Sequence, residues 1–476
     1  MNRVTRIFDW NCQRQFAAAS GDYNPIHIDA IASRRTTAGA PIVHGMHSLI
    51  WLLDCLSGAG YTLIGPTRLN VQLVRPIYVG EEVAAEISGS SQGEAGARIL
   101  VAGDVAVAAS LNRSDAGPCS GVMLSNCVEG HSPPDVPADL AIEQLDGFRG
   151  KLAFDFGRAD LQRMFPAAAT GFGLNAVAAL ACSSCLVGME IPGLHSMYLG
   201  LNLILVGDKT SVGDGLDYQA RVVSARFGAV RIEIWGVGVQ GTLEVLRRPP
   251  PAKQPDMDQV RSLIAPDEFQ GTRALIIGGS RGLGELTAKI ISAGGGDVVL
   301  TYLRGKTDAE SVLAQIEGGG GRGSAMRYDT ALSAWDQIAE IVPAPTQIYY
   351  FATPRIARPG LDVFDRERFA EFTDVYVDSF LDLVKSCARW GTSRVRVFYP
   401  STTFIERRPK GMTEYAMAKA AAEVMCRDIS GKVEGVEIMS RRLPRVATDQ
   451  TLSTVQVALA DSAGLIRDVV RAMHAE

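Results

Sequence analysis

The sequence predicts an α+β region built from two similar halves, followed by an α/β domain with a Rossmann-type, doubly wound parallel sheet. Two stretches each combine one long apolar helix pattern with alternating strand patterns. A buried strand that runs into a glycine-rich turn opens the last part of the chain. With 476 residues, the chain is longer than one hydrophobic core usually serves, and its length suggests about three domains.

Two proline-rich segments give the expected boundaries. They read Ser132-Pro-Pro-Asp-Val-Pro-Ala138 and Arg247-Arg-Pro-Pro-Pro-Ala-Lys-Gln-Pro255, and such compositions form extended, semi-rigid spacers. We therefore expect domains at residues 1–130, 131–250 and 270–476, with residues 251–269 as a linker.

The first two domains show the same order of elements. The first has an expected helix at 46–58, a strand from Arg68, and strands at 83–90 and 97–110; the second has a helix at 173–187 and strands at 217–223 and 229–237. One helix wrapped by an antiparallel sheet is the hot-dog fold, so we expect a double hot dog. A single copy leaves a sheet edge and apolar surface uncovered, which the second copy would bury.

The segment Ser20-Gly-Asp-Tyr-Asn-Pro-Ile-His27 carries the strongest chemical signal. Asn-Pro and the preceding glycine are turn residues, so the Asp22 carboxylate and the His27 imidazole can converge from a bent loop. A histidine held beside a carboxylate has a pKa suited to taking a proton from water. The alternative is structural: Asp22 caps a helix through Asn24, and His27 is a loop histidine with its hydrogen bonds satisfied.

A second block, Pro41-Ile-Val-His-Gly-Met46, opens the first apolar helix. The amide of Gly45 would then lie at a helix N-terminus. Such an amide can stabilise the enolate oxygen formed when water adds to a double bond conjugated to a thioester carbonyl.

Together the two blocks resemble the hydratase motif of MaoC-like (R)-specific enoyl hydratases and dehydratases. The resemblance implies a hot-dog fold, an acyl-CoA or acyl-carrier-protein thioester as substrate, and catalysis by Asp22, His27 and Gly45. The second half lacks the motif and reads Phe165-Pro-Ala-Ala-Ala-Thr-Gly171 at that place. We expect it to be catalytically silent and to shape the acyl tunnel, with His195 structural.

The third domain begins with the strand Arg273-Ala-Leu-Ile-Ile277, and its glycine turn reads Gly278-Gly-Ser280-Arg281-Gly282-Leu283-Gly284. These glycines let backbone amides approach a pyrophosphate at a helix N-terminus. Further on, Tyr415 and Lys419 have i,i+4 spacing on one helix face. A neighbouring cation favours the phenolate of a tyrosine, whose ordinary pKa is near 10.

From about Thr272 onward the chain resembles short-chain dehydrogenases/reductases, most closely 3-oxoacyl-thioester reductases. This resemblance implies that Tyr415 protonates the substrate carbonyl, that Lys419 holds the ribose, and that Ser401 or Thr402 positions the substrate. Pro444 and Thr448 would contact the nicotinamide end. The chain departs from the family at two places: Phe351-Ala-Thr-Pro354 replaces Asn-Ala-Gly, and Tyr376 or Asp378 stands where an asparagine is expected.

Charge after the second strand of this domain predicts NADPH as the cofactor. An enzyme that prefers NAD normally has an acidic residue there, whereas this chain has Arg304 and Lys306. With Arg281 these cations suit a 2′-phosphate, unless Arg304 and Lys306 are only solvated surface charges. Asp329, after the third strand, is expected to meet the adenine amino group.

Composition limits the remaining possibilities. The formal net charge of −5 and the pI near 5.8 give no basic surface for nucleic acid or membrane. The start of the chain lacks the apolar core of a leader peptide. The 8 cysteines form no disulfide or metal-ligand pattern, so we expect a cytoplasmic protein without a metal, in which Cys182-Ser-Ser-Cys185 is buried and structural.

The expected function is bifunctional: NADPH-dependent 3-oxoacyl reduction, and dehydration of the 3-hydroxyacyl product or hydration of the 2-enoyl thioester. Tethering two consecutive steps raises the local concentration of the intermediate. Two alternatives stay open: a dehydratase with a non-catalytic NADP-binding domain, and a non-catalytic module that binds acyl thioesters. The reductase resemblance also implies a homo-oligomer, with a dimer the simplest case.

Overall fold

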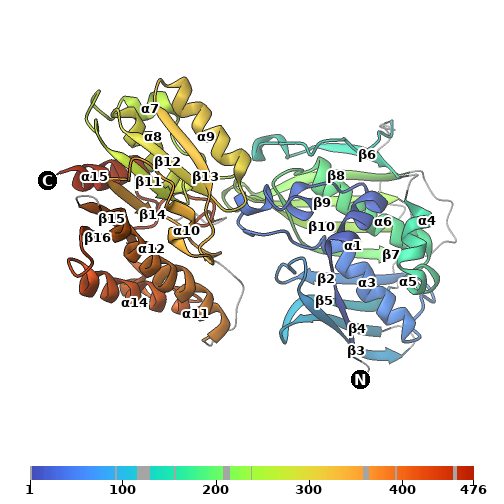
Figure 1. The fold of residues 1–476 in the computed structure, drawn as a ribbon. Coiled ribbons are helices and arrows are strands. Elements are labelled where there is room, and N and C mark those ends of the chain that lie inside the picture. The colour runs from blue at the N-terminus through green and yellow to red at the C-terminus, as the bar shows by residue number, and fades with distance from the viewer. Residues whose placement is uncertain are drawn as a thin grey trace. The chain divides into compact units, whose positions relative to one another are not determined.

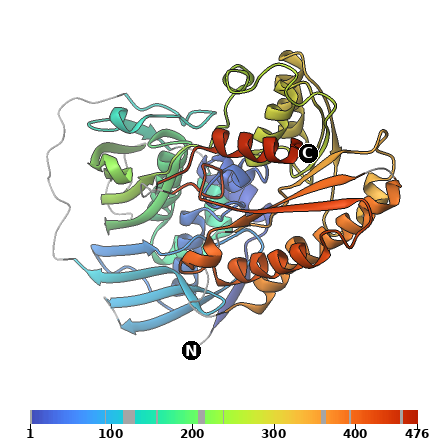
Figure 2. The same ribbon diagram turned by 90° about the vertical axis from the view of Figure 1, so that its left-hand side faces the viewer.

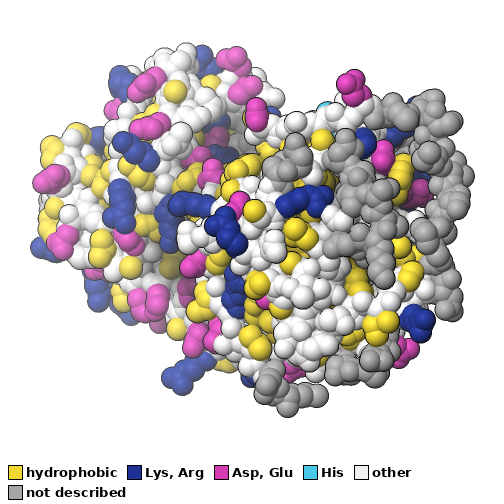
Figure 3. Space-filling view, turned by 90° about the vertical axis from the view of Figure 1, so that its right-hand side faces the viewer, with side chains coloured by type: hydrophobic (Ala, Val, Ile, Leu, Met, Phe, Trp, Pro, Cys, Tyr) yellow, Lys and Arg dark blue, Asp and Glu magenta, His cyan; other side chains and the backbone are white. Residues whose placement is uncertain are grey.

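The computed structural model describes residues 3–91, 94–114, 129–154, 157–206, 215–236, 238–356, 364–391, 394–453 and 458–475 (Figure 1). The chain divides into two compact units, one holding Met1–Pro250 and the other Pro251–Leu452 and Val457–Glu476. Cys119 and Cys127 lie outside the described residues. On the face drawn in Figure 3, acidic and basic side chains are interspersed, in line with the small net charge.

The strands of the first unit are β1 (Val4–Ile7), β2 (Thr67–Leu73), β3 (Glu82–Ser91), β4 (Glu94–Val101), β5 (Asp104–Arg113), β6 (Arg149–Ala153), β7 (Ser196–Leu205), β8 (Gly215–Ser224), β9 (Ala229–Gly236) and β10 (Val239–Arg247). Its helices are α1 (Trp10–Ser20), α2 (Pro25–Ile28), α3 (Gly45–Gly58), α4 (Arg158–Met164), α5 (Pro166–Gly171) and α6 (Leu174–Cys185). Short 3₁₀ turns are η1 (Ser33–Arg35), η2 (Ile142–Gln144) and η4 (Ala225–Phe227), and the π-helix η3 (Leu186–Glu190) continues α6.

These strands form a 10-stranded sheet in the order β1-β3-β4-β5-β2-β7-β10-β9-β8-β6. Read outward from the β2–β7 junction, the two halves have the same order, with β6 to β10 in the places of β1 to β5. The junction is antiparallel, with Leu69 opposite Leu203. Helices α3 and α6 pack against each other, and one core cluster includes Leu52 from the first half and Leu180 from the second. The two expected halves therefore share one sheet and one core.

One expected strand of the first half is divided in two. The pattern at 97–110 predicts a single strand, whereas β4 ends at Val101 and β5 begins at Asp104. Ala102 and Gly103 between them have φ values of 51° and 92°, which turn the chain into an antiparallel hairpin. Buried and exposed residues alternate on both sides of this turn, because β4 and β5 bury the same face of the sheet. The alternation of apolar residues therefore did not reveal the turn. The last residue of the expected strand at 229–237 lies outside the described residues.

The strands of the second unit are β11 (Arg273–Ile277), β12 (Asp297–Tyr302), β13 (Arg322–Arg327), β14 (Gln347–Tyr350), β15 (Val395–Thr402) and β16 (Val436–Leu443). Its helices are α7 (Met257–Arg261), α8 (Gly282–Ala293), α9 (Lys306–Gly318), α10 (Ala334–Ile338), α11 (Arg366–Thr373), α12 (Ser379–Cys387), α13 (Phe404–Arg407), α14 (Thr413–Ile429) and α15 (Ser462–His474), with the π-helix η5 (Asp374–Asp378) between α11 and α12 and the 3₁₀ turn η6 (Ala388–Trp390) after α12.

All neighbouring strands of this 6-stranded sheet are parallel, in the order β13-β12-β11-β14-β15-β16. Figure 2 shows α15, next to the C-terminus, and α14 on opposite sides of this sheet. Alternate residues of β11 enter separate core clusters: Ala274 and Ile276 join the one that includes α8 and α15, and Leu275 and Ile277 join the one that includes α12 and α14. Helices therefore cover both faces, and this strand order is that of a Rossmann-type sheet. The predicted doubly wound parallel sheet is present.

The segment expected to be a linker, residues 251–269, differs from that expectation. Its second part forms α7, which packs on α8, and Met257, Val260 and Phe269 are buried in the core of the second unit. The proline-rich composition of its first part hid the apolar spacing that follows. Across the described residues, no helix combines the length and apolar character needed to cross a bilayer.

Candidate active sites

Asp22 is placed by the end of α1. Gly21 closes the helix in the left-handed conformation (φ 75°), and its N–H donates to Ala17 O at 2.8 Å. Glycine adopts this conformation without the strain that a Cβ would cause. The turn directs the next residue inward, and Asp22 is only 2% exposed.

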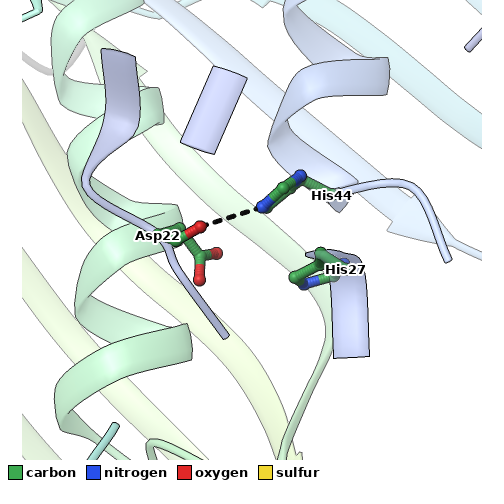
Figure 4. A group of neighbouring side chains, drawn as sticks. All are labelled: Asp22, His27 and His44. Atoms are coloured by element: carbon green, nitrogen blue, oxygen red, sulfur yellow. Dashed lines mark hydrogen bonds between the residues drawn. The ribbon is translucent and has the colours of Figure 1, made fainter. Parts of the chain in front are cut away.

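His27 is placed by a helix that begins at the Asn-Pro turn. The Asn24 side chain caps α2 by accepting from Ile26 N at 3.2 Å, and Pro25 occupies the first helical position. The cap is thus Asn24 itself, whereas the structural alternative gave this role to Asp22, whose Oδ1 accepts from Asn24 N at 3.2 Å. The same cap directs His27 toward Asp22 rather than away from it (Figure 4).

Asp22, His27 and His44 form one cluster, in which a carboxylate oxygen and a nitrogen of each ring lie within 4.8 Å of one another. His27 Nδ1 lies 2.8 Å from Ile42 O. A carbonyl only accepts, so Nδ1 carries the proton and Nε2 of the neutral ring is the basic atom. Two hydrogen bonds of about 2.8 Å through one water can span such a separation.

His44 completes this cluster, although the sequence marked it only as the residue before Gly45. Its Nε2 donates to Asp22 O at 3.1 Å, its Nδ1 lies 2.8 Å from Gln13 Oε1, and its ring stacks on that of His27 with centroids 4.0 Å apart. Gln13 also contacts the buried His47, with 3.3 Å between Gln13 Nε2 and His47 Nδ1. Because Nδ1 of His27 and Nε2 of His44 donate to backbone carbonyls, neither of these two nitrogens offers a lone pair to a metal ion.

Burial shifts both titratable groups toward their neutral forms. Desolvation raises the pKa of the Asp22 carboxyl, although His27, Ser184 and the Asn24 amide oppose the shift. Desolvation also lowers the pKa of His27; the positive charge of Arg248 adds to this effect, while Asp22 and the Ile42 carbonyl oppose it. His27 is therefore a neutral base at physiological pH.

Gly45 is the first residue of α3, as predicted. Its N–H belongs to the first helical turn, whose amides have no intrahelical partner. A Cβ at this position would lie 2.6 Å from Leu73 Cδ1, so glycine fits the closely packed entry to the helix.

The comparison with known families agrees with this geometry. Residues 11–109 match the family model of the MaoC like domain. This range contains Asp22, His27 and Gly45. A curated relative, the (R)-specific enoyl-CoA hydratase of Aeromonas caviae, is 42% identical over 76 residues, which is 15% of this chain. The matched part spans about half, 54%, of that relative's length.

The MaoC-like half contacts the second half of the unit directly at Asp22. Ser184 Oγ donates to Asp22 Oδ2 at 2.7 Å, and Asn24 Nδ2 donates to Gly188 O at 2.7 Å. Sequence reasoning missed Ser184 and Gly188, because it treated Cys182-Ser-Ser-Cys185 only as a buried helical run. Elsewhere in that half, Phe165 is buried in the core, and His195 Nε2 lies 3.4 Å from Asp139 Oδ1.

In the second unit, the glycine turn joins β11 to α8 as predicted. Gly278 and Gly282 have positive φ values of 82° and 60°. A Cβ at Gly284 would lie 2.2 Å from Gly278 O, so the helix can approach the turn this closely only with glycine there. Thr448 lies beside the N-terminus of α8, since its Cγ2 is 3.7 Å from an ideal Cβ built on Gly282. The turn thus brings Thr448, predicted for the nicotinamide end, next to the predicted phosphate cradle.

The cations predicted to bind a 2′-phosphate have different environments. Arg281 Nη1 lies 3.1 Å from Asp449 Oδ2, and Asp449 is 7% exposed. Arg304 is exposed, and Lys306 pairs with Glu310 at 3.6 Å on α9. The structure therefore places Arg281 between the glycine turn and the segment after β16.

The other predicted cofactor contacts lie at the carboxyl ends of the strands. Asp329, just after β13, caps its own turn by accepting from Ala331 N at 3.1 Å, and it pairs with Arg327. Ser280 is largely buried, whereas Leu283 packs on the adjacent core. Pro444 follows β16 directly and is half-buried.

Tyr415 lies on α14 with 9% of its surface exposed. Burial raises its pKa to about 12, and a hydrogen bond with Thr402 opposes the shift. Ser401 Oγ instead donates to Glu423 Oε1 at 2.5 Å, and Glu423 also accepts from Arg442. Of the two candidate hydroxyls, Thr402 faces Tyr415, whereas Ser401 is engaged with Glu423.

Lys419 lies on the same helix but its ammonium faces aromatic rings. Nζ donates to Pro400 O at 2.8 Å and lies 3.9 Å from the ring centroid of Tyr376 and 4.5 Å from that of Tyr399. Burial lowers the pKa of Lys419 to about 7. Tyr376, rather than the exposed Asp378, packs edge-on against Tyr415, so a phenol stands where an asparagine was expected.

Solved structures similar to this chain include a short-chain dehydrogenase and a 3-oxoacyl reductase. One from Burkholderia cenocepacia, in complex with NADP, is 26% identical and covers 44% of this chain and 92% of its own, with a TM-score of 0.38. The 3-oxoacyl (acyl-carrier-protein) reductase of Agrobacterium tumefaciens, with NADP bound, is 21% identical and covers 39% and 74%, with a TM-score of 0.36. TM-scores this low carry no argument about the fold. The fold of the second unit is therefore assigned from its strand order alone.

Proposed function

We propose that the first unit adds water to 2-enoyl thioesters and removes it from (R)-3-hydroxyacyl thioesters. One observation carries this proposal: Asp22 and His27 face each other within the span of a single water, next to the N-terminus of α3. The match of residues 11–109 to the MaoC like domain supports it.

The protonation states give each group a role. In hydration, His27 Nε2 takes a proton from the water held with Asp22 while the water oxygen bonds to C3. Negative charge then develops on the thioester oxygen, which the Gly45 amide stabilises. C2 next takes a proton from the pair, which restores both groups, and dehydration follows the same steps in reverse.

We further propose that the first unit is a double hot dog in which only residues 1–130 carry chemistry. The equal strand orders of the two halves support this reading. Residues 131–250 lack an Asp-x-Asn-Pro-x-His segment, and Phe165 fills the corresponding region with core packing. This second half would shape the tunnel for the acyl chain.

For the second unit, we propose NADPH-dependent reduction of 3-oxoacyl thioesters. The glycine turn suits a dinucleotide, because Gly284 lets α8 approach Gly278 more closely than a Cβ would allow, and Arg281 and Arg304 would meet the 2′-phosphate. Gly278, Ser280, Gly282 and Leu283 would line the pyrophosphate, with Asp329 at the adenine, and Pro444 and Thr448 at the nicotinamide. When bound, NADPH would supply the hydride.

The residues of α14 and β15 would handle substrate and proton. Tyr415 would donate a proton to the carbonyl oxygen, and Thr402 would position that oxygen, since its hydroxyl faces the phenol. Lys419 would hold the ribose. One observation favours an alternative in which this unit binds NADP without chemistry: Lys419 is held by Pro400 and by the Tyr376 ring, in place of an asparagine-linked relay.

Crotonyl-CoA hydration tests the first site. We expect Asp22→Asn and His27→Ala to lower the rate by about 100-fold or more, as for loss of a general acid or base. Asp160→Asn is a matched control, because Asp160 lies on an exposed helix face and pairs only with Arg163 among its described partners. Undiminished hydration in both site variants would show that the first site is misassigned.

Oxidation of NADPH in the presence of a 3-oxoacyl-CoA tests the second site. We expect turnover in the native protein and its loss in Tyr415→Phe. A thermal shift with NADPH but no turnover on any thioester would instead support the NADP-binding alternative. Absence of both would remove the cofactor proposal.

A further inference from the structure

We propose that the second half of the first unit is part of the hydratase site, with Ser184 as a positioning residue for the Asp22 carboxylate and Gly188 as the position that makes room for it. This inference rests on the proposed hydratase function. Residues 131–250 then form part of the site and do not only cover it, because the half that carries the motif does not by itself fix the Asp22 carboxylate.

Ser184 and Asn24 hold the two oxygens of Asp22 from different halves. Ser184 Oγ donates to Oδ2 at 2.7 Å, and Asn24 N donates to Oδ1 at 3.2 Å. Ser184 is 4% exposed, so no bulk water competes for this bond. Because each oxygen accepts from a donor, the carboxylate cannot rotate freely, and it keeps the orientation in which it faces His27.

Gly188 limits where that carboxylate can lie. It belongs to the π-helix η3, and a Cβ built on it would come 2.3 Å from Asp22 Oδ1 and 2.7 Å from Asp22 Cγ. Any side chain at this position therefore displaces the carboxylate. Asn24 Nδ2 also donates to Gly188 O, so the same residue anchors the cap of α2.

Further contacts join the same two segments. Cys185 Sγ donates to Gly21 O at 3.3 Å, and Tyr23 N donates to Met189 Sδ at 3.2 Å. The loop that carries Asp22 thus lies along the C-terminal end of α6 and the π-helix that follows it. The wide turn of a π-helix, a common feature of functional sites, brings Gly188 against the loop.

The consequence is electrostatic as well as steric. Burial favours the neutral Asp22 carboxyl, and the hydroxyl of Ser184 opposes this by donating to the ionised form. The titratable groups that face Asp22 are His27 on α2, His44 at the start of α3 and Cys185 on α6. Unlike these three groups, the Ser184 hydroxyl does not titrate in this range, and it donates to Asp22 without adding a charge.

Ser184→Ala tests the proposal, with Ser183→Ala as a matched control. Ser183 is its buried neighbour on α6, but its hydroxyl donates to Leu180 O and contacts Tyr198 OH instead. We expect Ser184→Ala to slow crotonyl-CoA hydration about tenfold at neutral pH and to move the acid limb of the pH profile up by about one unit. Ser183→Ala should leave the position of that limb unchanged, and Ser184→Thr, which keeps a hydroxyl, should restore it.

A second measurement does not depend on activity. The carboxyl ¹³C shift of Asp22, assigned with Asp22→Asn, reports its titration in the intact chain. We expect Ser184→Ala to raise this pKa, and Gly188→Ala to change the shift and slow hydration more strongly than Ser184→Ala. If the Asp22 titration in Ser184→Ala matches that of Ser183→Ala, the positioning role is wrong. Inactivity of the native protein together with a raised Asp22 pKa in Ser184→Ala would refute the hydratase function alone.

Discussion

At the scale of single residues, the first site depends on two groups that burial moves in opposite directions on the pH axis. The pKa of Asp22 rises and that of His27 falls, both mainly through desolvation. A neutral imidazole beside a carboxylate is the state that can accept a proton from water. Protonation of Asp22 as pH falls removes this state, and it does so at a higher pH than for an exposed aspartate.

The pH dependence of hydration follows from these directions. As pH falls, Asp22 takes up its proton at a higher pH than an exposed aspartate, whose pKa is near 3.8, because its folded pKa is raised. His27 stays neutral to a lower pH than an ordinary histidine, because its folded pKa is lowered. We expect Asp22 to contribute to the acid limb of kcat/KM for crotonyl-CoA, and Asp22→Glu should move this limb. A limb that persists unchanged in Asp22→Asn would assign the titration to another group.

The hydroxyl at the second site gives another test of single residues. Thr402 hydrogen bonds to Tyr415, whereas Ser401 donates to Glu423. We expect Thr402→Ala to lower 3-oxoacyl reduction about tenfold or more and Ser401→Ala to change it by less than about threefold. Thr402→Ser should recover most of the rate. A larger loss in Ser401→Ala than in Thr402→Ala would return the role to Ser401.

Sequence reasoning found the residues whose signal is local. Asp22 and His27 are five positions apart in a recognisable turn, and Tyr415 and Lys419 share a helix face. Ser184 and Gly188 could not be found in this way, because their contacts with Asp22 and Asn24 cross more than 160 positions of sequence and an isolated serine or glycine in an apolar helix has no distinguishing pattern. The orientation of Lys419 toward the Tyr376 ring likewise depends on contacts between distant parts of the sequence, so no local pattern predicts it.

At the scale of elements, turns decide what the regular segments present. Gly21 ends α1 and directs Asp22 inward, and Ala102-Gly103 divides one alternating pattern into β4 and β5. Apolar runs of suitable length predicted α3, α6 and β11 close to their observed bounds, and all three are buried along most of their length. The π-helices η3 and η5 escaped prediction because a local extra residue per turn leaves the apolar spacing almost unchanged.

The approach of α8 to its glycine turn makes a prediction at this scale. Gly284→Ala would place a Cβ 2.2 Å from the backbone oxygen of Gly278, and backbone cannot rotate away as a side chain can. We expect NADPH affinity to fall at least tenfold, about 1.4 kcal/mol, in a direct binding titration. Gly318→Ala, at the end of α9, is the matched control, because nothing lies within 4 Å of its Cβ. Equal affinity in the two variants would show that this turn does not receive the dinucleotide.

At the scale of the whole molecule, the chain combines two compact units whose proposed reactions share an intermediate. Reduction of a 3-oxoacyl thioester yields the 3-hydroxyacyl thioester that the first unit would dehydrate. The two sites use separate residues, so each can be removed without altering the other. Their independence makes the order of the steps measurable in one protein.

Two single variants should separate these steps. With a 3-oxoacyl-CoA and NADPH, Asp22→Asn should oxidise NADPH at the native rate yet accumulate the 3-hydroxyacyl-CoA, since the dehydration step lacks the Asp22 carboxylate. Tyr415→Phe should leave NADPH unoxidised but still convert crotonyl-CoA to 3-hydroxybutyryl-CoA, and mass spectrometry distinguishes these products. Hydration that fails in Tyr415→Phe while the variant stays folded would contradict two independent sites. If the native protein hydrates crotonyl-CoA but never oxidises NADPH, the cage of Tyr376 and Tyr399 around Lys419 becomes the physical reason for a binding role in the second unit.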